Sequence, residues 1–163
     1  METNEAFRRF TSVLAEEGSR ASLAYLVGLT NYRFIGLFQF FDGMANAAVH
    51  YDRMNPQVLT LKEVPDTATY CWYVRDRKAM FSTANALADP RLADHPSRTK
   101  VLAYCGVPVI DPEGVLEEIL CLYDVEPRDP DQLELELLVQ VASALQQRHC
   151  IPPYPAKPTA AFA

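Results

Sequence analysis

The sequence predicts an α+β domain with a central antiparallel sheet of five or six strands. Terminal helices are expected on one face of the sheet, and short helices and loops on the other. Two observations support this: apolar residues follow a helical spacing at both ends of the chain, and two β-hairpin patterns lie between them. The strand over 33–41 is apolar on both faces, which indicates a central strand covered on each side.

Residues 1–30 are predicted to form a helical N-terminal segment. Apolar residues from Phe7 and Phe10 onward recur every three to four positions, and Gly18 interrupts the pattern. Ser19 is expected to cap a second helix, since a hydroxyl can bind the free backbone N–H groups of a first turn. These two helices are expected to cover one face of the sheet.

Two hairpins are predicted in the core, which spans residues 31–128. Asp42-Gly43 suits a tight two-residue turn after the strand over 33–41. The stretch "DPEG", beginning at Asp111, suits a turn between strands over 102–110 and 115–124. Cys105 and Cys121 are therefore expected on neighbouring strands.

The segment 64–100 is expected to cover the second face of the sheet as a lid. Asp66 is a predicted helix cap, a short strand is expected over 78–82, and Asp89-Pro90 and His95-Pro96 each suit the opening of a helical turn. A lid of short helices and loops over a sheet favours a small-molecule pocket between them.

The last helix is predicted over 129–149, beginning at Asp129-Pro130. Leu137, Val141 and Leu145 repeat every four residues, and further apolar residues extend onto a second helix face. That second face favours a homodimer through the terminal helices. The proline-rich stretch 151–163 is expected to be a flexible tail, so residues 1–150 form the single domain.

Composition excludes several classes of function. The chain has 163 residues, a net charge of -6 and no clustered Lys and Arg, which argues against nucleic-acid binding. It has no apolar run long enough for a membrane span, and its first residues lack a signal-peptide pattern. Four widely spaced cysteines are few for a disulfide scaffold. We therefore expect a cytoplasmic protein with free thiols.

Four blocks carry a family resemblance: "FIGLFQFFDG", "VPDTATYCWYV", "ADPRLADHP" and "YCGVPVIDPEGVLEEILCLYD". In their order over residues 21–145 they resemble a bacterial stand-alone subgroup of GAF domains. The resemblance implies a PAS-like fold and a sensory or regulatory role with a small ligand, a homodimer and a separate signalling partner. Glu118-Ile119 and Leu122 replace the Gly-Thr pair and the histidine that usually surround the cysteine in this subgroup.

Nine residues are candidates for ligand binding. Aromatic residues with a polar group can line a pocket, arginines suit carboxylates or phosphates, and a histidine can contact an anion. Each also has an ordinary structural explanation: core packing for the aromatics and cysteines, solvent or neighbouring acids for the arginines, and loop hydrogen bonds for the histidine. The candidates are Tyr70, Cys71, Trp72, Arg75, Arg91, His95, Tyr104, Cys105 and Cys121.

The preferred interpretation is a small-molecule sensor without catalytic activity, because no catalytic triad, phosphate-binding glycine loop or paired-carboxylate motif is present. The cysteines show no metal-ligand spacing, and Leu122 departs from the bilin-attachment pattern. Two alternatives stay open: a thiol-based redox enzyme similar to methionine-sulfoxide reductases, and an interaction module with a vestigial pocket. We expect Cys105 to be a packed strand residue at the pocket floor.

Overall fold

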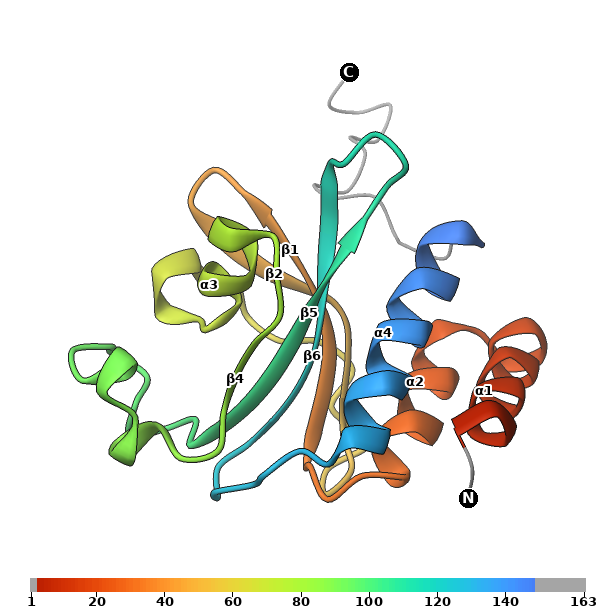
Figure 1. Cartoon of the computed structure of the whole chain (residues 1–163), viewed down its shortest axis with the longest axis horizontal. Helices are drawn as coiled ribbons and strands as arrows, with labels where there is room; N and C mark the ends of the chain where they lie inside the picture. Colours follow the sequence, from red (N-terminus) through yellow and green to blue (C-terminus); the bar gives the residue numbers. More distant parts are fainter. Residues whose placement is uncertain (1–2, 149–163) are drawn as a thin grey trace.

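The computed structural model describes residues 3–148 and has a six-stranded sheet of order β3-β2-β1-β6-β5-β4. Helices α1, α2 and α4 lie on one side of the sheet, and α3 with the neighbouring loops lies on the other (Figure 1). The predicted α+β architecture is confirmed. The proline-rich stretch 151–163 lies outside the described residues.

Two hairpins form the centre of the sheet, as predicted. β1 (Phe34–Phe41) pairs with β2 (Met44–Asp52), β5 (Ala103–Ile110) pairs with β6 (Leu116–Asp124), and β1 pairs with β6 to join them. Asp42 and Gly43 both have positive φ, at 52° and 76°, as the predicted tight turn requires.

Three helices cover the first face, which we call the helix face: α1 (Thr3–Glu17), α2 (Ser19–Gly28) and α4 (Gln132–Gln147). Two predicted caps are wrong. Gly18, not Ser19, precedes α2 and makes no side-chain cap. α4 begins later than predicted because the Asp131 carboxylate accepts the Glu134 N–H at 2.7 Å.

The second face, which we call the lid face, is covered by residues 64–101 as expected. This lid contains β3 (Val64–Pro65), α3 (Cys71–Arg77), β4 (Phe81–Thr83) and 3₁₀ turns at Asp66–Ala68, Ala86–Ala88 and Pro90–Leu92. Asp66 does not cap α3, because its carboxylate forms an ion pair with Arg75 at 2.9 Å. The strand predicted over 78–82 begins only at Phe81, since Lys78 takes a left-handed conformation that ends α3.

Each face of the sheet has its own buried cluster, which confirms that the central strands are covered on both sides. Ile35, Leu37 and Leu120 belong to the helix-face cluster, and Phe38, Tyr104 and Ile119 to the lid-face cluster. Because side chains alternate along a strand, each strand supplies both clusters. Among the described residues, no helix is long and apolar enough to cross a membrane.

Candidate functional site

A cavity of about 210 Å³ lies between the lid face of the sheet and the lid. Its lining comes from both layers and is predominantly apolar. It comprises Phe38, Ala45, Ala47, Leu61, Lys62, Val64, Ala68, Thr69, Tyr70, Cys71, Ser97, Val101, Tyr104, Cys121 and Tyr123. A small concave space of this kind, apolar with a few polar groups, is typical of ligand sites.

A row of small residues crosses three neighbouring strands next to the cavity, and Cys121 is the member of the row that lines it. Cys121 in β6 pairs with Gly36 in β1 on one side and with Gly106 in β5 on the other. A Cβ atom at Gly106 would stand 2.2 Å from the Tyr104 hydroxyl oxygen, and one at Gly36 would stand 2.7 Å from a ring carbon of Phe38. The glycines therefore let aromatic rings lie close over the sheet.

Two tyrosines of the lining direct their hydroxyl protons to protein acceptors. The Tyr70 hydroxyl donates to the Val101 carbonyl at 2.7 Å, and the Tyr104 hydroxyl donates to Cys71 Sγ at 3.1 Å. Burial raises the pKa of Tyr70 to about 12 and that of Tyr104 well above its ordinary value. Both residues are neutral hydrogen-bond donors.

Cys71 and Cys121 lie together on the cavity wall, and Tyr104 contacts Cys71. Burial raises the pKa of Cys121 well above its ordinary value, and a hydrogen bond with Cys71 contributes to this shift. A thiol with a raised pKa carries little thiolate at neutral pH and is a weak nucleophile. Cys121 is therefore a wall residue rather than a reactive centre, and Cys71 is buried beside it.

The expectation that Cys105 lies at the pocket floor is wrong. Cys105 pairs with Leu122 and belongs to the helix-face cluster, whereas Tyr104 before it faces the lid. Burial raises the pKa of the Cys105 thiol to about 12. Cys105 is nevertheless a packed strand residue, as predicted, but on the opposite side of the sheet from the cavity.

A histidine and a tyrosine from different hairpins meet beside the cavity. His50 Nε2 and the Tyr123 hydroxyl form a hydrogen bond of 2.5 Å, and Phe34 stacks on the Tyr123 ring with centroids 4.7 Å apart. His50 is 4% exposed, and burial lowers its pKa to about 4, so the imidazole is neutral. The sequence analysis did not identify this pair.

Four other predicted residues are outside the cavity lining. The Arg91 guanidinium binds the Asp89 carboxylate at 2.7 Å, and the Arg75 guanidinium binds Asp66. His95 Nε2 bonds the Thr69 carbonyl at 3.3 Å, and its Nδ1 accepts the Ser97 N–H at 3.1 Å. Trp72 is partly exposed and packs edge-on against Tyr73. The structure thus gives these four side chains structural contacts instead of a place in the cavity lining.

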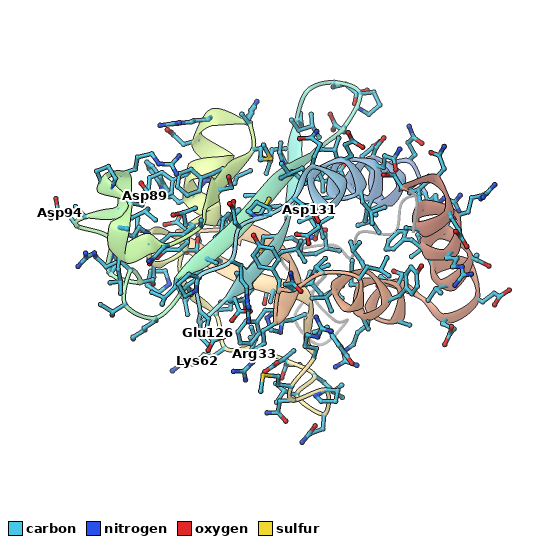
Figure 2. All side chains as sticks on the ribbon, turned by 60° about the horizontal axis from the view of Figure 1, so that its bottom comes forward. Arg33, Lys62, Asp89, Asp94, Glu126 and Asp131 are labelled. Atoms are coloured by element: carbon cyan, nitrogen blue, oxygen red, sulfur yellow. The ribbon has the colours of Figure 1, made fainter. Side chains whose placement is uncertain are left out.

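Among the lining residues that the sequence analysis missed, Tyr123 had a recognisable signal and Lys62 had none. Tyr123 lies two positions after Cys121 and so faces the same side of β6. Lys62 belongs to the stretch between β2 and β3 that looked irregular in sequence, and Figure 2 shows it on the side of the molecule that also carries Arg33 and Glu126.

Among residues 3–148, no three His, Cys, Asp or Glu side chains gather as a metal site would require.

The fold and cavity define a class of domain with a curved antiparallel sheet and a ligand-sized space beneath a lid. A GAF domain family model matches residues 8–148, and the chain belongs to that family. A segment of 75 residues, 44% of this chain, is 33% identical to a cyclic di-GMP phosphodiesterase from Pseudomonas aeruginosa. This chain spans 13% of the length of that relative.

Solved structures agree on the fold. The GAF domain of an Acinetobacter phosphoenolpyruvate-protein phosphotransferase superposes with a TM-score of 0.71, covering 89% of this chain and 90% of that one at 12% identity. A free methionine-R-sulfoxide reductase from Neisseria meningitidis, solved with its substrate, gives 0.68, with 90% and 87% covered at 18% identity.

A phycoerythrobilin-bound GAF domain from a cyanobacterial phytochrome gives a TM-score of 0.66, with 91% and 97% covered at 17% identity. At these identities the likeness concerns the fold alone. Together with the family assignment, the comparisons support the GAF fold.

Proposed function

We propose that this chain is a sensory or regulatory domain that binds a small molecule in the cavity beneath the lid and signals through a separate partner protein, without catalysing a reaction. The observation that carries the proposal is the cavity itself. It is lined by buried residues of the lid-face cluster, among them Phe38, Tyr104 and Cys121. Its lining comes from both layers and is mostly apolar with a few polar groups, which suits a small ligand.

The lid offers a route from ligand to signal. It reaches the sheet through the short edge strands β3 and β4 and through aromatic contacts such as Tyr70 edge-on to Tyr104 of β5, with centroids 5.7 Å apart. Segments joined by few ordered contacts open more easily than a central sheet. A ligand that contacts both layers would favour the closed lid, and a partner could distinguish the two states.

The redox alternative is disfavoured by the state of the thiols. Cys71, Cys105 and Cys121 are buried and unpaired within the described part of the chain, and burial raises the pKa of both Cys105 and Cys121. The likeness to the methionine-sulfoxide reductase is one of fold and brings no reactive thiol to this chain. We therefore propose a ligand-binding domain rather than a redox enzyme.

We propose a homodimer formed through the terminal helices. Val139 in α4 is 54% exposed although its helix packs on the sheet, so an apolar side chain remains available for a second copy. Native mass spectrometry of freshly purified protein reports the oligomeric state and any bound small molecule in one spectrum. A dimer carrying an additional small mass, lost on denaturation, is the expected result.

A cavity-filling variant distinguishes bound ligand from surface adducts. Ala47 lines the cavity, so Ala47→Leu is expected to abolish the extra mass while the protein stays folded. Ala93 is exposed, and Ala93→Leu is the matched control that keeps the ligand. An extra mass that survives Ala47→Leu, or wild-type protein that is empty and binds only a protein partner, would favour the interaction-module alternative.

A further inference from the structure

The chemistry of the bound molecule can be inferred from the hydrogen-bond donors of the cavity lining, and this inference rests on the proposed function. Four hydroxyl groups other than that of Tyr123 are present in the lining, and each donates to a protein acceptor. The Tyr70 hydroxyl donates to the Val101 carbonyl, Tyr104 to Cys71 Sγ, Ser97 to the Ala68 carbonyl at 2.6 Å, and Thr69 to the Asp66 carbonyl at 2.8 Å.

The Tyr123 hydroxyl differs because its partner is the neutral ring of His50. If the proton of His50 is on Nδ1, Tyr123 donates to Nε2, and the Nδ1–H is a buried donor. Nδ1 has no hydrogen-bond partner among the residues that the structure describes. If the proton is on Nε2, the imidazole donates to the Tyr123 oxygen, and only an acceptor lone pair on Nδ1 is left unpaired.

The second arrangement is favoured, because buried donors without partners are rarer in proteins than buried acceptors without partners. With the proton on Nε2, the Tyr123 hydroxyl accepts from His50, and its own proton stays available. Tyr123 lines the cavity. It therefore supplies a donor for a ligand, and His50 is the positioning residue that fixes the direction of that donor.

Size and polarity restrict the ligand further. An apolar cavity of about 150 Å³ holds one benzene ring, and pockets for drug-sized ligands begin near about 300 Å³. The volume of about 210 Å³ falls between these values. Lys62 is the one charged residue of the described lining and is exposed to solvent, so the enclosed part of the site has no buried charge for an ionic ligand.

We propose that the cavity takes an uncharged molecule of about one aromatic ring bearing a carbonyl-type oxygen, to which the Tyr123 hydroxyl donates a hydrogen bond. A phosphorylated nucleotide brings charge that the lining does not match, and a multi-ring cofactor would extend beyond the cavity into solvent. The ring would pack against Phe38, Tyr104 and Cys121, which line the cavity.

A matched pair of probes tests the proposal with the full chain. Acetophenone has the carbonyl oxygen, and α-methylstyrene has nearly the same shape with a CH₂ group in its place. Affinities are measured by calorimetry. Wild-type protein is expected to bind acetophenone about fivefold more tightly, the ratio that one net neutral hydrogen bond provides.

Tyr123→Phe removes only the hydroxyl and is expected to reduce this ratio to about one while α-methylstyrene still binds. Tyr51→Phe is the matched control, since Tyr51 lies outside the cavity lining and packs against the helix-face cluster, and the fivefold ratio should persist. NMR of the ring nitrogens in isotope-labelled protein, with His50 signals assigned through His50→Asn, should show the proton on Nε2.

The outcomes distinguish a wrong ligand class from a wrong proposed function. Equal affinities for both probes in wild-type protein, or a proton on Nδ1 of His50, would overturn the inference while binding of the hydrocarbon supports the proposed ligand site. If neither probe binds and purified protein nonetheless carries a small mass sensitive to Ala47→Leu, the proposed function stands and the ligand class is wrong. If neither probe binds and no such mass is present, both proposals fail.

Discussion

The helix face and the lid face of the same sheet are built from different residues. On the helix face the strands present branched aliphatic side chains such as Leu37, Leu120 and Leu122, which pack directly against three helices. On the lid face they present glycines, Cys121 and large aromatic rings, and a cavity remains under the lid. Aliphatic side chains fill the space under the helices, whereas the aromatic side chains of the lid face leave a cavity between sheet and lid.

The difference assigns separate tasks to the two faces. Burial on the helix face supplies the larger share of tightly packed apolar contacts, and burial on the lid face is incomplete where the ligand is proposed to bind. The layers that cover the two faces lie apart. Figure 2 shows Asp89 and Asp94, which belong to the lid, at one side of the view and α1, which covers the helix face, at the other. A change on either face should therefore affect stability and binding unequally.

The largest effect is expected from a cavity made on the helix face. Leu120 is fully buried, and Leu120→Ala should lower the free energy of unfolding by about 2–5 kcal/mol. Val101 is half-buried and borders the existing cavity, so Val101→Ala should cost only about 1 kcal/mol. Urea unfolding followed by circular dichroism measures both, and equal losses would contradict the comparison.

A smaller effect is expected from Glu118, a carboxyl group in β6 with no exposed surface that pairs with Val109 of the helix-face cluster. Neither of its carboxyl oxygens has a partner within residues 3–148. Burial, with a contribution from Glu117, raises its pKa from 4.5 to about 9. The folded protein therefore keeps this proton between those two pH values, while the unfolded chain releases it.

Because the folded state binds the extra proton, the stability from this group is complete below pH 4.5 and falls as pH rises toward 9. Glu118→Gln removes the dependence, so the wild-type protein should lose about 2 kcal/mol or more relative to this variant between pH 5 and pH 8. Urea unfolding at several pH values measures the difference. Glu113→Gln, at an exposed turn residue, is the control, and parallel pH profiles for wild type and Glu118→Gln would refute the assignment.

The smallest effect is expected in thiol reactivity, and it compares the two faces directly. Cys71 and Cys121 border the cavity, whereas Cys105 lies under the helices. Opening of the lid should expose the first two thiols more often than unfolding exposes Cys105, with rates of alkylation by iodoacetamide about tenfold apart. Peptide mapping by mass spectrometry resolves each site. Faster reaction of Cys105 would mean that the helix face opens first.

The fold could be predicted from the sequence because its signals are local. Alternation along 33–41, the Asp42-Gly43 turn and the four-residue repeat of the last helix each depend on neighbours in the chain. Alternation also places Tyr104 and Cys105 on opposite faces, and that signal alone could have kept Cys105 out of the pocket. Helix starts were less predictable, since Asp129 and Asp131 both suit a cap and only packing selects Asp131.

The sequence by itself determined the two hairpins, the terminal helices and the alternation of faces, because these follow from backbone geometry and short-range spacing. The tertiary structure decided which chemistry meets in the cavity. A register shift between Val109 and Ile110 moves the β5–β6 pairing by one residue, so that Cys121 lies opposite Gly106 instead of Cys105. His50 meets Tyr123, 73 positions away, only because β1 joins the two hairpins into one sheet.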